Sequence, residues 1–116
     1  MITSQEIEQF LREFKYKSGF YGVSIDTERA KNLQTMADLE LSGKHIIKIL
    51  NGIKITDYSS GPTEDVIGTG PPLWVFGCEV KGHEVYIKIT MGNLSDNTVC
   101  VSFHKSERPM NYPYKT

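Results

Sequence analysis

The second half of the chain contains two pairs of side chains that can take part in chemistry, and the members of each pair have the two-residue spacing of a β-strand. Tyr86 and Lys88 lie two residues apart, and so do Ser102 and His104. Residues two apart in a β-strand point to the same face of a sheet. A tyrosine supplies a hydrogen-bond donor, a lysine a positive charge, and a histidine a group that exchanges protons near neutral pH. Such a set can hold an anion and move a proton beside it.

The strands that would carry these residues are joined by a hairpin. Lys81 and Gly82 form a two-residue loop, in which glycine supplies the positive φ that tight hairpins require. Pairing Val80 with His83 then collects the apolar residues of both strands on one face, away from Tyr86 and Lys88. This apolar face consists of Trp74, Phe76, Cys78, Val85, Ile87 and Ile89.

Alternation along residues 98–104 predicts a third strand. The side chains expected to face the core are Val99, Val101 and Phe103, and those expected on the other face are Cys100, Ser102 and His104. A loop over residues 92–98 would place Lys88 opposite Ser102 and Tyr86 opposite His104. The four polar groups would then lie within about two cross-strand spacings of about 5 Å each. An ordinary solvated sheet face shows the same alternation, so spacing alone leaves that alternative open.

Length and composition indicate one folded domain, residues 1–116. With 39% hydrophobic and 23% charged residues, the chain has a globular rather than a disordered composition. No apolar run approaches the ~20 residues that span a membrane. The amino terminus lacks the basic start and apolar core of a secretion signal. We therefore expect a cytoplasmic protein with no membrane partner.

Cysteine usage and charge exclude several other classes of protein. Cys78 and Cys100 are too few for a disulfide framework and fall on opposite faces of the expected sheet, so we expect free thiols. The chain has neither the ligand spacing of a zinc site nor a phosphate-binding glycine motif, so we expect no metal or other cofactor. The net charge is −1, with −3 on residues 1–80 and +2 on residues 81–116. Any site for a polyanion would therefore be local.

The amino-terminal segment has the pattern of a helix. Thr3 and Glu6 form a capping-box pattern that begins it, and Gly19 is expected to end it near residue 17. A short strand is expected at residues 20–25. The side chains at helical spacing that would face the core are Ile7, Phe10, Leu11 and Phe14.

Two further helices are expected before the main strands. One begins at Asp26 or Thr27, and the other begins at Ser42 and ends at Gly52. The residues expected to face the core are Ala30, Leu33 and Ala37 in the first of these helices and Ile46, Ile47 and Leu50 in the second.

The remaining segments complete the predicted fold. A strand is expected at residues 53–58, and the glycine- and proline-rich residues 59–72 predict a long mobile loop beside the polar face. The predicted fold class is α+β, with three N-terminal helices packed on one face of a mainly antiparallel sheet.

The carboxyl-terminal segment combines positive charge with aromatic rings. Arg108, Tyr112 and Tyr114 lie among prolines that exclude a regular helix or a central strand. This combination suits base stacking together with phosphate contact. It suits equally a tail that its tyrosines hold against the sheet, and both interpretations remain open.

Several of these segments resemble the motility quorum-sensing regulator (MqsR) family of type II toxins. The resemblance covers roughly residues 27–116. It rests on residues 85–90 (Val-Tyr-Ile-Lys-Ile-Thr), on the Trp74 strand, on Asp57-Tyr58, and on Ser-Phe-His at 102–104 with the tail that follows. It implies a RelE-like fold, a metal-independent endoribonuclease that cleaves mRNA in the cytoplasm, and inhibition by a cognate antitoxin protein.

The resemblance carries over to single residues only in part. Tyr86 matches a family tyrosine associated with activity, and Lys88 falls on a basic position of the family. The branch that gives the family its name has a glutamine where this chain has Val75, and a lysine where it has Ser59 and Ser60. Either His104 and the tail replace these polar groups, or activity is weak or lost.

The chemistry of RNA cleavage can be matched to the residues independently. It requires deprotonation of the 2′-hydroxyl, protonation of the leaving oxygen and stabilisation of charge on the phosphorane. We expect His104, Lys88 and Tyr86 to be catalytic, and Arg108, Ser102, Tyr112 and Tyr114 to bind substrate. The alternative is a non-catalytic domain that binds RNA or protein on the same scaffold.

Overall fold

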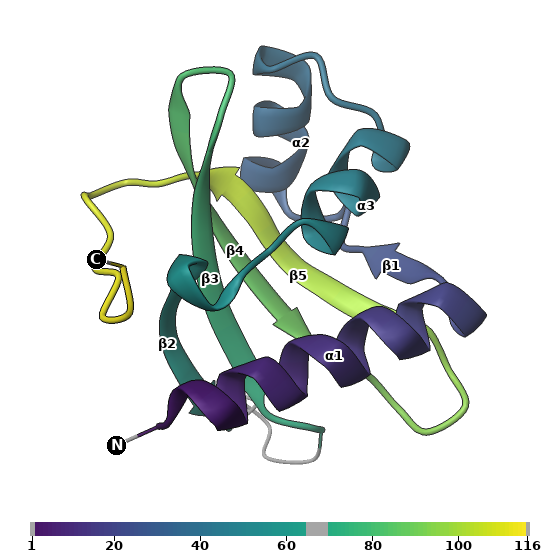
Figure 1. The fold of residues 1–116 in the computed structure, drawn as a ribbon. Coiled ribbons are helices and arrows are strands. Elements are labelled where there is room, and N and C mark those ends of the chain that lie inside the picture. The colour runs from purple at the N-terminus through teal and green to yellow at the C-terminus, as the bar shows by residue number, and fades with distance from the viewer. Residues whose placement is uncertain (1, 65–69, 116) are drawn as a thin grey trace.

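The computed structural model describes residues 2–64 and 70–115. The order of elements is a helix, a short strand, two helices and then a four-strand meander (Figure 1). The helices are α1 (Ser4–Tyr21), α2 (Ala30–Asp38) and α3 (Gly43–Asn51), with a 3₁₀ helix η1 at Ile55–Asp57. The strands are β1 (Val23–Ile25), β2 (Tyr58–Thr63), β3 (Leu73–Val80), β4 (His83–Thr90) and β5 (Thr98–Lys105). Within the described ranges, no helix is long and apolar enough to cross a membrane.

The five strands of the described residues form one mainly antiparallel sheet. Their spatial order is β1-β5-β4-β3-β2, and only β1 runs parallel to its neighbour, β5. The predicted hairpin register is confirmed, with Val80 opposite His83. The register between β4 and β5 is also confirmed, because Tyr86 lies opposite His104 and Lys88 opposite Ser102. The α+β class with N-terminal helices follows from the order of these elements.

Helix α1 supplies one wall of the core. Its predicted capping box, Thr3 with Glu6, is present. Phe10 stacks on Trp74 of β3 with ring centroids 4.3 Å apart, and the four predicted core residues of the helix are buried. The helix continues to Tyr21, beyond the expected end near residue 17, because Gly19 is tolerated inside an exposed helix at a cost of about 1 kcal/mol. Gly22, with φ 83°, ends the helix and leaves only a three-residue β1.

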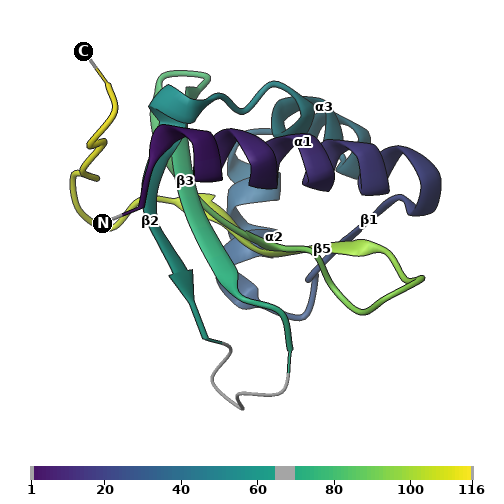
Figure 2. The ribbon, with the colours of Figure 1, turned by 60° about the horizontal axis from the view of Figure 1, so that its bottom comes forward.

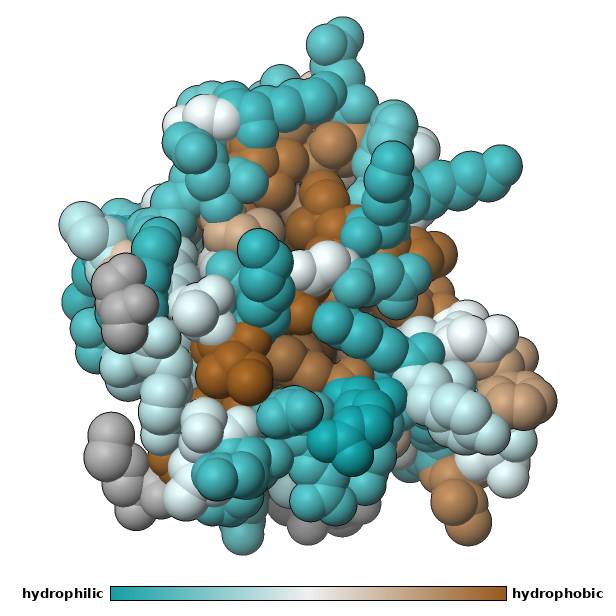
Figure 3. Space-filling view, in the orientation of Figure 1, coloured by the Kyte–Doolittle hydropathy of each residue, from teal (hydrophilic) through white to brown (hydrophobic). Residues whose placement is uncertain are grey.

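Helices α1 and α3 lie on the same side of the sheet (Figure 2). Helix α3 follows Ser42 and precedes Gly52 as predicted, with Ile46 and Leu50 buried and Ile47 half-buried. Seen from this side, hydrophobic residues are visible in the middle, where the helices lie over the sheet, and hydrophilic residues surround them (Figure 3). We refer to the opposite side of the sheet as the open face.

Helix α2 differs from its prediction in start, buried side and position. It begins at Ala30, after the N-cap residue Arg29, and its buried residues are the polar Asn32 and Thr35, whereas Leu33 is exposed. The cause is that α2 lies along the edge of β5, where β1 no longer covers the strand. Asn32 and Thr35 bond to the backbone of that edge, so polar side chains are required where periodicity indicated an apolar stripe.

A β-bulge in β5 changes the side of the sheet to which residues 99–101 point. Lys88 pairs with Ser102 but Ile89 pairs with Cys100, which leaves Val101 as the extra residue. As a result Cys100 is fully buried in the core, and the prediction that it lies on the opposite face is wrong. Val99 and Val101, expected in the core, are only half-buried and line a cleft on the open face. Cys78 is half-buried, and both cysteines are free as predicted.

The segment before β3 also differs from the prediction. Residues 53–57 do not form a strand, because Asp57 accepts the Lys54 N–H in a 3₁₀ turn. The strand β2 begins instead at Tyr58, whose ring packs edge-on against Trp74 and Phe76. β2 extends through Thr63 into the predicted loop of residues 59–72, and residues 65–69 of that loop lie outside the described residues.

Candidate functional site on the open face

Five of the seven predicted site residues line one cleft on the open face. This cleft, here called the histidine cleft, has a volume of about 460 Å³. Its lining includes Tyr86 and Lys88 from β4, Ser102 and His104 from β5, Arg108 from the segment after β5, and Arg29 from the start of α2. The confirmed register of β4 and β5 therefore brings together the residues that were paired from the alternation of side chains along each strand.

The rings of Tyr86 and His104 stack in the cleft. Their centroids lie 5.2 Å apart with planes inclined by 17°, as expected for residues directly opposite on neighbouring strands. The Lys88 ammonium lies 5.8 Å from the centre of the Tyr86 ring. Nδ1 of His104 is 3.0 Å from the Lys105 carbonyl oxygen, which can only accept a hydrogen bond. Nδ1 therefore carries the proton, and Nε2 is the nitrogen available to a ligand.

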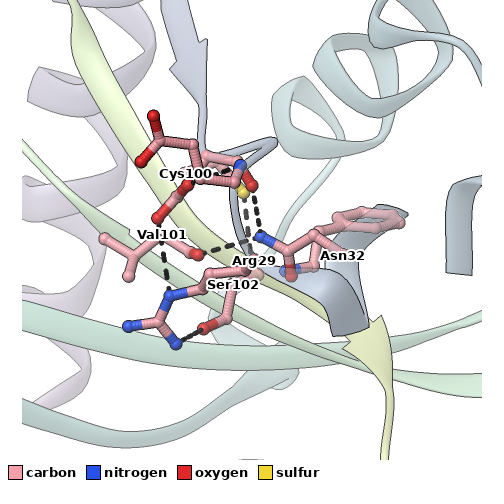
Figure 4. Close-up of polar contacts among 8 residues, drawn as sticks. Arg29, Asn32, Cys100, Val101 and Ser102 are labelled. Atoms are coloured by element: carbon pink, nitrogen blue, oxygen red, sulfur yellow. Dashed lines mark hydrogen bonds and ion pairs between the residues drawn. The ribbon is translucent and has the colours of Figure 1, made fainter. Parts of the chain in front are cut away.

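Arg29 lies at one end of the histidine cleft. Its Nη1 donates to the Ser102 hydroxyl at 3.4 Å, and its Nε lies 3.5 Å from Oδ2 of Asp26 (Figure 4). Ser102 itself is almost completely buried, at 1% exposed. Ser102 therefore positions the guanidinium and offers little surface of its own to a ligand. Lys88, opposite Ser102 on β4, lines the same cleft as Arg29.

The segment after β5, residues 106–115, crosses the open face and is here called the tail. Met110 N–H and the Tyr112 hydroxyl both donate to the Glu84 carboxylate, at 3.0 and 2.8 Å. The tail lies close on β3, because a Cβ added to Gly77 would be 2.5 Å from the Tyr112 hydroxyl. Burial, and the bond to Glu84, raise the pKa of Tyr112.

The tail tyrosines lie apart from the histidine cleft. The Tyr114 hydroxyl donates to the carbonyl of Ile2, and its ring packs edge-on against Tyr58. Neither Tyr112 nor Tyr114 lines the cleft. Of the two interpretations of the tail, the structure therefore favours a segment held in place by its tyrosines. Next to Arg108, Glu107 is paired with Lys31 at 2.6 Å, and this hydrogen bond lowers the pKa of Glu107.

The positions that depart from the toxin pattern also line the histidine cleft. Val75 lies opposite Lys88 and is 6% exposed, and Ser59 and Ser60 belong to the neighbouring strand β2. Ser59 donates to the carbonyl of Asn111 in the tail at 2.7 Å. The cations of the cleft accordingly come from elsewhere, namely Lys88, Arg29 and Arg108.

Sequence reasoning missed Arg29. It precedes a helix that was expected to begin earlier, and no local periodicity indicates that the start of α2 meets Ser102. Among the described residues, no three His, Cys, Asp or Glu side chains are grouped so that they could hold a metal ion. Comparison with known protein families, with characterised proteins and with solved structures finds no match to this chain.

Proposed function

We propose that this protein is an endoribonuclease that cleaves mRNA without a metal ion and acts as the toxin of a type II toxin–antitoxin pair. The observation that carries the proposal is the gathering of Tyr86, Lys88, His104 and Arg108 in the histidine cleft. This set offers a proton-transfer group, two cations and a hydrogen-bond donor to one ligand. Its partners would be an mRNA substrate and a cognate antitoxin protein.

The proposed reaction is attack of a ribose 2′-oxygen on the adjacent phosphorus. Nε2 of neutral His104 takes the 2′-hydroxyl proton as the 2′-oxygen bonds to phosphorus, and the bond to the 5′-oxygen breaks. Lys88 and Arg108 stabilise the charge on the phosphorane, and Tyr86 donates a hydrogen bond to a phosphate oxygen. The leaving 5′-oxygen takes a proton from Lys88 or from water. The products are a 2′,3′-cyclic phosphate and a 5′-hydroxyl.

A second candidate function is an RNA- or protein-binding domain without catalysis. The observation that favours it is the replacement of two polar family positions by a buried Val75 and by Ser59 and Ser60, all of which line the same cleft. A cleft with cations and stacked rings can bind single-stranded RNA without cleaving it.

The test compares His104→Ala with His83→Ala. His83 is exposed in the hairpin between β3 and β4 and lies outside the histidine cleft, so it controls for loss of a histidine elsewhere. Purified proteins are incubated with single-stranded RNA in EDTA, and the product ends are identified. We expect wild type and His83→Ala to leave cyclic phosphate ends, and His104→Ala to be slower by roughly 10²-fold or more.

Two outcomes would contradict parts of this proposal. Equal cleavage by His104→Ala would remove the role given to that histidine. If wild type neither cleaves RNA nor arrests growth when expressed, with or without ribosomes in the assay, the binding-domain function should replace the enzymatic one.

A further inference from the structure

The open face carries a second cleft next to the first. This cleft, here called the valine cleft, has a volume of about 490 Å³, and its lining includes Val99, Val101, Asn93 and Asn97. Arg29 and Lys88 line it as well, and they are also part of the histidine cleft. The two clefts therefore meet at this pair of cations.

The valine cleft has the composition of a base-binding site rather than of a phosphate site. The β-bulge at Val101 places Val99 and Val101 on the open face, and Leu73 of β3 adds a third apolar side chain. The exposed Asn93 and Asn97 also line the cleft, and Nδ2 of Asn97 donates to the carbonyl of Tyr21. Unstacked bases are recognised by hydrogen bonds to their edges and by packing of the ring against aromatic or apolar side chains. Asp96, also in the lining, opposes a phosphate in this cleft.

The cations between the clefts are placed to hold a phosphate. Asp26 and Ser102 hold the Arg29 guanidinium by its Nε and Nη1, which leaves further N–H donors, and the side chain is 51% exposed (Figure 4). Lys88 also lines both clefts, and its ammonium lies 5.8 Å from the centre of the Tyr86 ring in the histidine cleft. Arginine binds phosphate through two parallel N–H donors, to which a lysine adds a second positive charge.

We propose that the open face holds two successive nucleotides of single-stranded RNA, with the second base in the valine cleft and a phosphate bound between the clefts by Arg29 and Lys88. Arg29 is then a substrate-positioning residue. This inference rests on the proposed function, because it extends the same RNA site beyond the histidine cleft. It predicts that affinity depends on the length of the RNA.

The test uses 2′-O-methyl oligonucleotides of one to four nucleotides, which bind but cannot be cleaved through the 2′-oxygen. Binding to the full-length protein is measured by fluorescence anisotropy over a range of salt concentrations. For wild type we expect affinity to increase about 10-fold from one nucleotide to two, because the second base then buries its ring against the apolar side chains of the valine cleft.

Three variants and one control test the roles of the valine cleft and of Arg29. Val99→Asp and Asn93→Ala should reduce the increase to less than about 3-fold. Arg29→Gln should weaken dinucleotide binding about 10-fold and reduce the salt slope by about 0.7, the value for one phosphate contact with a single strand. Lys44→Gln removes the same charge from an exposed position of α3 outside both clefts and should change neither quantity.

The outcomes separate this inference from the proposed function. Equal affinity for one and two nucleotides, or an increase that survives both cleft variants, would overturn the second subsite while leaving RNA binding at the histidine cleft intact. Failure of wild type to bind any of the oligonucleotides would count against the proposed function itself.

Discussion

Asn32 replaces a neighbouring strand at the edge of β5, and its removal should strongly destabilise the fold. Its Nδ2 donates to the carbonyls of Asp26 and Val101, at 2.8 and 3.0 Å, and its Oδ1 accepts the Phe103 N–H at 2.9 Å. The side chain is fully buried, and its amide points at the bulge carbonyl of Val101 (Figure 4). In Asn32→Ala the carbonyl of Val101 and the N–H of Phe103 lose the hydrogen bonds that the Asn32 amide makes to them.

The expected decrease in the free energy of unfolding follows from these two backbone groups. A buried donor or acceptor that loses its partner costs roughly 1–3 kcal/mol, so two of them give about 4 kcal/mol. That is a large share of the ~5–15 kcal/mol that stabilises a typical domain. Asn32→Asp keeps the shape and the acceptor for Phe103 but turns an oxygen toward two carbonyls. It should therefore destabilise the protein by a similar amount without a change in packing volume.

Urea unfolding followed by circular dichroism measures the free energy of unfolding of each variant. Gln34→Ala is the matched control, because Gln34 lies in the same helix and is exposed, and its side chain bonds to the carboxylate of the exposed Asp38 rather than to the backbone of β5. We expect the control to remain within about 0.5 kcal/mol of wild type. If Asn32→Asp unfolds at the same urea concentration as wild type, the view that Asn32 completes the edge of β5 is refuted.

Two further predictions concern the tail and the cysteines. In Gly77→Ala the new methyl group would lie 2.5 Å from the Tyr112 hydroxyl, so the tail should move away and the Met110 amide should lose its protection from hydrogen exchange. Gly19→Ala, where nothing lies within 4 Å of the added Cβ, should leave that protection unchanged. Burial raises the thiol pKa to about 11 for Cys78 and about 12 for Cys100, so both should react slowly with a disulfide reagent at about pH 8 and fast after denaturation. Because the folded state favours the protonated thiols, stability should decrease as the pH rises above the ordinary thiol value of 9.0, and fast reaction of native protein would contradict this burial.

Local pattern was sufficient for the main strands and for most of the histidine cleft. Glycine at position 82 and alternation on both sides of it set the register of β3 and β4, and face matching then set Tyr86 opposite His104. These features depend on neighbouring residues and on the two-residue repeat of a strand, so they can be inferred from the amino-acid sequence. The helix caps at Thr3 and Ser42 also involve residues three apart in the chain, so they too can be inferred from the amino-acid sequence.

Contacts between distant segments decided the rest. The bulge at Val101 turns Cys100 inward and two valines outward, and alternation cannot indicate where a strand takes an extra residue. The polar buried side of α2 depends on Asn32 meeting an uncovered edge of β5, about 70 residues away in the chain. Arg29 reaches the histidine cleft because α2, which it precedes, lies along this edge of β5. The sequence by itself therefore determined the strands β3, β4 and β5 and the pairing of their polar residues, whereas tertiary packing decided which further residues surround them.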